Sequence, residues 1–75
     1  MDLVIEADDG RIVGIEVKAA ATIDRRDFAG IEALRELAGS RFHRGVVIYT
    51  GAEPLPFGNR LFAVPISALW EMGAA

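Results

Sequence analysis

Two runs of alternating polar and apolar residues, joined by Asp8-Asp9-Gly10, constrain the fold of this chain more than any other feature. The first run extends from Asp2 to Ala7 and the second from Arg11 to Lys18. Alternation with a period of two is typical of β-strands with one buried face. A three-residue loop ending in glycine suits a type I turn followed by a residue in the left-handed region. The sequence therefore predicts an antiparallel hairpin over residues 2–18.

The length of this loop fixes which residues of the hairpin face each other. The predicted pairs are Ala7 with Arg11, Glu6 with Ile12, Ile5 with Val13, Leu3 with Ile15 and Asp2 with Glu16. A two-residue loop would place the two apolar rows on opposite faces, because a slip of one residue inverts every side chain. We therefore predict that Asp2 and Glu16 are direct neighbours, and that Lys18 points to the same face.

Downstream of the hairpin the pattern predicts a helix, two strands and a second helix. Asp24 is a suitable N-cap for a helix from Arg25 to Ala38 that ends at Gly39. Its expected buried stripe is Phe28, Ile31, Leu34, Leu37 and Ala38. The apolar run 45–49 is typical of a strand inside a sheet covered on both faces. Residues 51–58 read as a loop, 60–64 as a short last strand, and Pro65 as the first turn of a helix ending near Met72.

The predicted order is therefore β-β-α-β-β-α, a small mixed sheet of the α/β class with a right-handed β-α-β crossover. The 75 residues form a single domain, 1–75, without repeats or an internal linker. Chains of this size have small cores, and 52% of these residues are hydrophobic. We therefore expect a homodimer or a higher homo-oligomer.

Charge and composition exclude several classes of function. The net charge of −3 disfavours broad binding to a phosphate backbone, so any nucleic-acid contact would be local. Cysteine is absent, which excludes disulfides and thiolate metal sites. No GxxxxGK[ST] loop occurs, so ATP hydrolysis is excluded for this polypeptide. No apolar run approaches the roughly 20 residues of a membrane span, and no signal-peptide pattern is present. We expect a cytoplasmic protein without membrane contact.

The charged face of the hairpin has two interpretations. Two carboxylates directly opposite on neighbouring strands repel each other, so Asp2 and Glu16 need compensation. A divalent cation would supply it through hard oxygen ligands, and Lys18 would then orient water or stabilise charge on a phosphate. Alternatively, Lys18 simply neutralises both carboxylates on a solvated face.

Other candidate residues carry weaker signals. Glu6 shares the face of Asp2 and is a candidate outer-shell ligand. His43 reads as a solvated loop residue. Arg25 and Arg26 oppose the helix dipole, so they either hold an anion or a partner carboxylate, or they lie at the surface. The remaining aromatic and apolar candidates, expected in the core or an interface, are Phe57, Phe62, Leu69 and Trp70.

Several blocks of the chain carry a family resemblance. They are Asp2, Gly10-Arg11-Ile12-Val13-Gly14-Ile15-Glu16-Val17-Lys18-Ala19, Asp27-Phe28-Ala29-Gly30, Arg44-Gly45-Val46-Val47-Ile48-Tyr49-Thr50-Gly51, Leu55-Pro56-Phe57-Gly58 and Val64-Pro65-Ile66-Ser67-Ala68-Leu69-Trp70. In this order they resemble the C-terminal domain of a large family of predicted bacterial and archaeal AAA-type ATPases, a domain of the PD-(D/E)xK restriction-endonuclease-like superfamily. The resemblance covers nearly the whole chain.

The resemblance implies a role for each charged residue of the hairpin. Asp2 takes the place of the motif aspartate, Glu16 that of the second metal-binding carboxylate, and Lys18 that of the motif lysine, with Mg²⁺ or Mn²⁺ as the metal. It also implies a helix and a strand ahead of the motif aspartate, and an ATPase module. This chain has neither, so we expect a truncated core with an unblocked edge strand from Asp2 to Ala7, open to pairing with a second copy.

Three functional hypotheses follow. The first is a truncated nuclease-like domain that keeps the Asp2, Glu16 and Lys18 constellation but lacks robust catalysis. The second is a noncatalytic module for oligomerisation or docking. The third is a Mg²⁺-dependent nuclease completed in trans by dimerisation.

Overall fold

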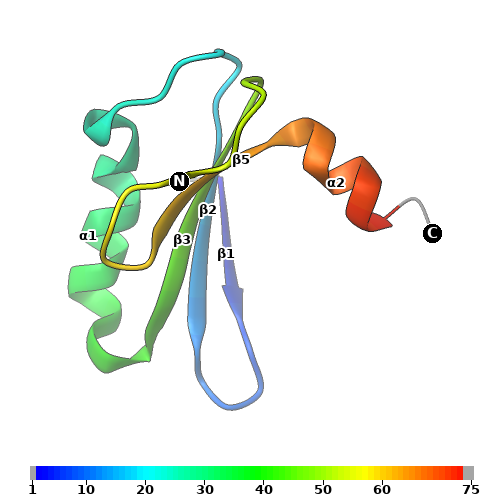
Figure 1. Cartoon of the computed structure of the whole chain (residues 1–75). Helices are drawn as coiled ribbons and strands as arrows, with labels where there is room; N and C mark the ends of the chain where they lie inside the picture. Colours follow the sequence, from blue (N-terminus) through cyan, green and yellow to red (C-terminus); the bar gives the residue numbers. More distant parts are fainter. Residues whose placement is uncertain (1, 74–75) are drawn as a thin grey trace.

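The protein is built on one five-stranded mixed sheet, and the computed structural model describes residues 2–73, with side chains to residue 69. The strands are β1 (Leu3–Glu6), β2 (Ile12–Val17), β3 (Phe42–Tyr49), β4 (Leu55–Pro56) and β5 (Leu61–Pro65), in the spatial order β1-β2-β3-β5-β4. The helical elements are η1 (Arg25–Phe28), α1 (Ala29–Ala38), η2 (Gly39–Arg41) and α2 (Ile66–Gly73), where η marks a 3₁₀ turn. β2, β3 and β5 run parallel, and α1 lies along one face of the sheet (Figure 1). The predicted mixed α/β class is confirmed.

The hairpin has the predicted register. The observed pairs are Leu3 with Ile15, Val4 with Gly14, Ile5 with Val13 and Glu6 with Ile12. Gly10 occupies the left-handed region with a φ of 89°, and its N–H donates to the carbonyl of Ala7 at 2.9 Å. Glycine adopts this conformation without the steric penalty of a side chain, which is why the loop closes at this position.

The crossover from β2 to β3 becomes helical at the predicted N-cap. The N–H of Arg26 donates to Asp24 Oδ1 at 2.9 Å, and the N–H of Asp24 donates to Asp27 Oδ2 at 2.8 Å. This reciprocal pair is a capping box, which satisfies backbone donors that have no partner within the helix. The first turn is 3₁₀ and continues directly into α1, which ends at Gly39 with a φ of 59°.

The core lies between α1 and the sheet face that it covers. Ile31 is fully buried above Gly45, where an added Cβ would lie 2.2 Å from Ile31 Cγ2. At the edge of this layer the rings of Phe28 and Phe57 stack with centroids 4.8 Å apart. The buried residues are Ile12, Phe28, Ile31, Ala38, Phe42, Val47, Tyr49, Leu61 and Ala63.

Leu37 does not belong to the buried stripe of α1, and its predicted burial was wrong. Its side chain is 86% exposed, whereas Ile31 and Ala38 are buried and Leu34 packs against the core. The reason is geometric, because Leu37 lies six residues after Ile31 and therefore about 240° around the helix.

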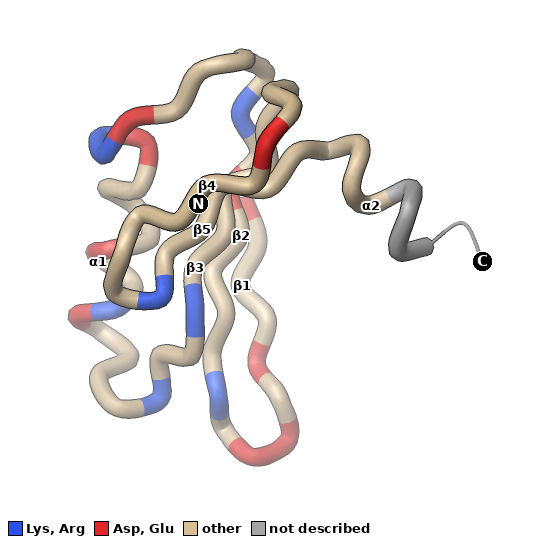
Figure 2. Tube along the Cα trace, in the orientation of Figure 1, with Lys and Arg blue, Asp and Glu red and all other residues tan. Residues whose placement is uncertain are grey.

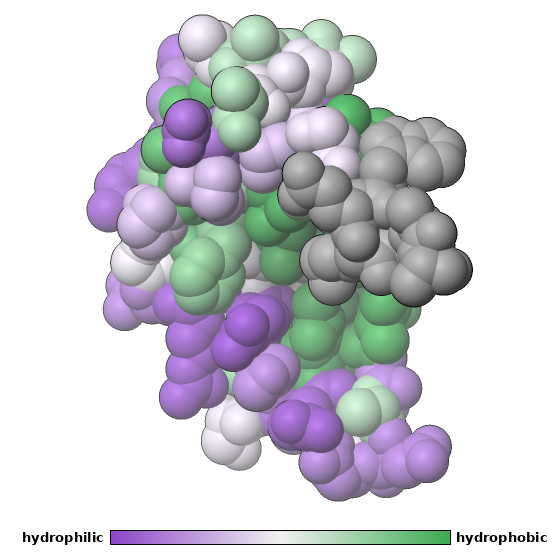
Figure 3. All heavy atoms as spheres, turned by 45° about the vertical axis from the view of Figure 1, so that its right-hand side comes forward, coloured by the Kyte–Doolittle hydropathy of each residue, from purple (hydrophilic) through white to green (hydrophobic). Residues whose placement is uncertain are grey.

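The face of the sheet away from α1 is only partly covered by the described residues, whereas the sequence predicted a sheet covered on both sides. We call it the open face, and its apolar residues are Leu3, Ile5, Val13, Ile15, Val17, Val46, Ile48, Phe62 and Val64. Val17 is 55% exposed, and apolar side chains gather on this side of the molecule (Figure 3). The cause is that α1 packs on the face of β2 that carries Ile12 and Glu16. The more apolar side chains of the hairpin therefore point away from α1.

The last part of the chain differs in detail from the expected order. Residues 51–58, predicted to be a loop, contain the two-residue strand β4, which pairs antiparallel with β5. The sequence pattern did not indicate this strand because Pro56 argues against a strand, except at the edge of a sheet or at a strand end. Pro65 closes β5, and α2 follows at once on the side of the sheet away from α1 (Figure 1). The side chain of Trp70 lies outside the described residues.

No helix within residues 2–73 combines the length and the apolar character needed to cross a membrane.

Candidate functional site

One hollow brings together the three residues that the sequence singled out. This carboxylate pocket has a volume of about 480 Å³. It lies where β2 ends and the first turns of η1 and α1 begin, and acidic segments meet there at the start of β1 and the end of β2 (Figure 2). Its lining residues are Asp2, Glu16, Val17, Lys18, Arg26, Asp27, Ala29, Gly30 and Val47.

Asp2 is held across the end of the hairpin by one hydrogen bond. The N–H of Val17 donates to Asp2 Oδ2 at 2.7 Å. This bond joins the residue before β1 to the end of β2, where Asp2 lines the pocket.

Glu16 projects from β2 toward the first turn of α1. A Cβ added at Gly30 would lie 3.6 Å from Glu16 Oε1 and 3.7 Å from Oε2. Both carboxylate oxygens therefore rest beside the helix N-terminus, where the helix dipole favours negative charge. The half-buried position of Glu16 limits the directions that its side chain can take.

Lys18 is tied to Asp27, a residue whose part in this pocket the sequence did not reveal. Lys18 Nζ donates to Asp27 Oδ1 at 2.6 Å, and the Asp27 side chain is only 17% exposed. The hydrogen bond from Lys18, supported by the N–H of Asp24, holds the pKa of Asp27 below its ordinary value of 3.8. No spacing rule of the sequence pairs Lys18 with Asp27, which lie nine positions apart.

The remaining candidates lie elsewhere or serve local structure. Glu6 forms an ion pair with Arg41 at 3.7 Å and is not part of the pocket lining. His43 lies within β3 rather than in a loop. Arg26 lines the pocket and pairs with Asp24 at 3.0 Å, and its side chain is 91% exposed, so this arginine has a carboxylate partner and also lies at the surface.

The donors of the pocket fit a hard cation that keeps several waters. Within residues 2–69, no group of three or more His, Asp or Glu side chains is placed to hold a metal ion. Mg²⁺ is commonly bound through one or two carboxylates, with water and substrate oxygens completing its shell. Asp2 and Glu16 are carboxylates that line the same pocket, so they are the candidates for holding such an ion.

Comparison with known families gives one match. A family model described as "Domain of unknown function (DUF4143)" matches residues 1–69. The matched region includes every residue that lines the carboxylate pocket. No curated protein and no solved structure matches the chain.

Proposed function

The chain belongs to the DUF4143 family, and from this premise we propose that it is a nuclease-like domain with a divalent-metal site for phosphodiesters. The proposal assigns it to the PD-(D/E)xK restriction-endonuclease-like superfamily, as the C-terminal type of domain found with predicted AAA-type ATPases of bacteria and archaea. The observation that supports it most strongly is that Asp2, Glu16 and Lys18 line a single pocket.

The proposed roles follow from the chemistry of each group. Asp2 and Glu16 would hold Mg²⁺ or Mn²⁺, and such an ion, when bound, polarises a phosphate oxygen and lowers the pKa of water. Lys18 would donate hydrogen bonds to a phosphate oxygen and stabilise the negative charge that develops there. Asp27 keeps the Lys18 ammonium at the wall of the pocket. Without the cation, two carboxylates would repel a phosphodiester, so binding of substrate depends on the metal.

A titration with Mn²⁺ tests the metal site directly. Because Mn²⁺ is paramagnetic, we expect selective broadening of the amide NMR signals of residues near Asp2 and Glu16 at millimolar metal. Glu16→Gln and Asp2→Asn each remove a charged ligand, and each should abolish the selective broadening. Mg²⁺ should reverse it in the unsubstituted chain by competition.

Glu32→Gln is the matched control, because it removes the same charge from a half-exposed carboxylate on α1 outside the pocket. It should leave the broadening unchanged. Equal broadening around Glu16 and Glu32 would contradict the proposal. Cleavage of plasmid or single-stranded DNA in Mn²⁺ counts as activity of this site only if Lys18→Ala and Glu16→Ala abolish it. Activity that survives both substitutions comes from a contaminant.

The second candidate function is a noncatalytic module that associates with another copy of the chain. It is favoured by β1, which is an edge strand with Leu3, Val4 and Ile5 all about half exposed. An edge strand presents unpaired backbone donors and acceptors that a second strand can satisfy. The open face adjoins this edge, so one interface would cover both.

Sedimentation equilibrium at micromolar concentration tests this second candidate. We expect a dimer or a higher oligomer for the unsubstituted chain, and a monomer for Ile5→Lys, which places a charge on the apolar edge. Leu37→Lys adds the same charge at an exposed apolar residue of α1, far from β1, and should leave the oligomer intact. A compact monomer for the unsubstituted chain would exclude this candidate.

A further inference from the structure

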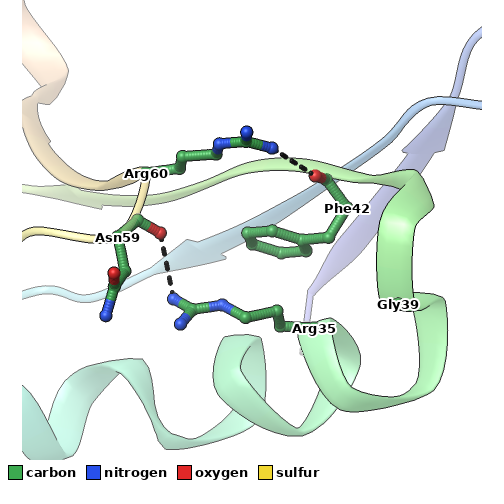
Figure 4. A pocket seen from close by; sticks show the side chains of 5 residues that line it. All are labelled: Arg35, Gly39, Phe42, Asn59 and Arg60. Atoms are coloured by element: carbon green, nitrogen blue, oxygen red, sulfur yellow. Dashed lines mark hydrogen bonds between the residues drawn. The ribbon is translucent and has the colours of Figure 1, made fainter.

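A second hollow, the arginine pocket, lies at the other end of the parallel strands and shares no lining residue with the carboxylate pocket. Its lining residues are Arg35, Gly39, Phe42, Asn59 and Arg60, and its volume is about 210 Å³. Arg35 comes from α1, Phe42 begins β3, and Arg60 directly precedes β5. The two arginine side chains reach past the Phe42 ring from opposite directions (Figure 4).

Each guanidinium is fixed by one backbone carbonyl and keeps further donors. Arg35 Nη2 donates to the carbonyl of Asn59 at 3.0 Å, and Arg60 Nη1 donates to the carbonyl of Phe42 at 3.1 Å. The Arg35 guanidinium also lies over the Phe42 ring, 5.2 Å from its centroid. Arg35 Nε is buried and has no acceptor among the side chains and backbone of the described residues. A buried donor without an acceptor is costly, and in native proteins it calls for an explanation.

The positive charge of the pocket is poorly compensated. Glu32 approaches Arg35 Nη2 at 3.9 Å, but its side chain is half exposed, and such surface pairs are weak. Within residues 2–69 no carboxylate forms an ion pair with Arg60. Two guanidinium groups thus line one small pocket of a chain whose net charge is −3. Positively charged groups that line one hollow raise the local concentration of anions there.

The backbone at Arg60 is strained, and this strained conformation determines where the Arg60 side chain leaves the turn. Gly58, Asn59 and Arg60 are consecutive residues with φ values of 77°, 48° and 66°. Glycine tolerates this left-handed region and asparagine visits it, whereas a long side chain does so at a cost. The turn is closed by the N–H of Leu61, which donates to the carbonyl of Gly58 at 2.8 Å. Strain of this kind persists where the surroundings over-determine it, and it clusters at functional positions.

We propose that the arginine pocket is an oxyanion site that takes a phosphate group without a metal ion. The guanidinium fork matches phosphate oxygens with paired hydrogen bonds, and Arg35 and Arg60 together offer more donors than the two carbonyls accept. The phosphate comes either from a small phosphate monoester or from the diester backbone of a nucleic acid. The site stands apart from the proposed nuclease function.

Titration of the metal-free chain with inorganic phosphate, in the presence of EDTA, tests the site by amide NMR. We expect saturable shifts at Gly39, Phe42 and Asn59 in the millimolar range. Arg35→Gln and Arg60→Gln each keep an amide donor for the backbone carbonyl but lose the charge, and each should weaken binding roughly ten- to hundredfold. Arg25→Gln changes the net charge equally at a residue outside both pockets, and it should bind phosphate normally.

Two further experiments identify the source of the phosphate and distinguish binding at this site from binding at the carboxylate pocket. A nucleoside monophosphate that competes with inorganic phosphate, while a short oligonucleotide does not, identifies a monoester, and the reverse identifies a diester. Glu16→Gln should bind phosphate unchanged, so loss of the metal site and loss of this site are distinguishable. Non-saturating shifts, or saturable shifts that persist in folded Arg35→Gln and Arg60→Gln, would overturn the proposal. If Arg60→Gln unfolds, Arg60→Lys keeps the charge without the fork and should weaken binding as well.

Discussion

Gly45→Val is expected to prevent stable folding, and Gly45→Ala to lower the free energy of unfolding by about 1–3 kcal/mol. A Cβ at this position would lie 2.2 Å from Ile31 Cγ2 and 3.1 Å from Leu61 Cδ2. Both neighbours are fully buried, and Ile31 is β-branched, so its methyl group has no free rotamer to adopt. Urea denaturation of Gly45→Ala measures the loss.

A double-mutant cycle with Ile31→Ala tests the cause. Ile31→Ala alone should cost about 2–5 kcal/mol through the cavity that it leaves. The double variant should lose less than the sum of the single losses, because the new methyl group enters that cavity. Gly30→Ala is the matched control, since a Cβ there meets only Glu16 oxygens at ordinary contact distance and alanine favours a helix. Strict additivity in the cycle would refute the steric explanation.

Asp27→Asn is expected to lower the free energy of unfolding by about 1–2 kcal/mol at neutral pH. It removes the charge that pairs with Lys18 at 2.6 Å and weakens the acceptor that closes the capping box at Asp24. Because the Lys18 side chain is 36% exposed, solvent screens part of the interaction, and the expected loss is correspondingly moderate.

The effect of Asp27→Asn should depend on pH in a defined direction. The pKa of Asp27 is lowered in the folded protein, so the unfolded chain binds this proton more readily. The stability from Asp27 is therefore present above pH 3.8 and is lost as the pH falls through the lower, folded-state pKa. Denaturation of the unsubstituted chain and of Asp27→Asn at several pH values should show that the difference between their free energies of unfolding disappears in strong acid. A difference that stays constant with pH would exclude the ion pair as its cause.

Asp9→Asn provides the comparison for an exposed ion pair. Asp9 pairs with Arg11 at 2.8 Å, and the pKa of Asp9 is likewise lowered, chiefly by the hydrogen bond from the Arg11 N–H. Both of these side chains are more than half exposed. The stability change should therefore be much smaller than that of Asp27→Asn.

Local chain chemistry was enough to predict the hairpin and the start of the helix. The loop ending in Gly10 allows one register that keeps the apolar residues together, and that register is observed. Asp24 was recognised as a cap because short acidic side chains accept hydrogen bonds from free backbone N–H groups. These features depend on residues close together in the sequence.

The side of the sheet that α1 covers was not predictable in the same way. Both rows of β3 are apolar, and the row of Val47 packs under α1 whereas that of Val46 lies on the open face. A run of apolar residues in one strand cannot tell two covered faces from one covered and one exposed. The choice is made where Ile31 enters the space above Gly45, a contact between distant segments.

The partner of Lys18 and the arginine pocket escaped prediction for a related reason. Asp27 meets Lys18 only because the crossover folds back over the end of β2, and sequence spacing does not describe that path. Arg35 and Arg60 meet only after β5 has paired with β3. Gly58 and Asn59 are residue types that accept the left-handed region, but nothing in the sequence indicates that Arg60 continues it.

The two pockets also differ in how far apart along the chain their linking contacts lie, and therefore in the entropy that is lost when each loop closes. Hydrogen bonds of the carboxylate pocket join residues 15 and 9 positions apart, whereas those of the arginine pocket join residues 24 and 18 positions apart. Shorter loops close at a lower entropic cost, and the difference here is about 0.5 kcal/mol. The Asp2 and Lys18 contacts can therefore form while β5 is still unpaired. A ligand of the arginine pocket would hold the start of β5 and the end of α1 together, and it would therefore stabilise the pairing of β5.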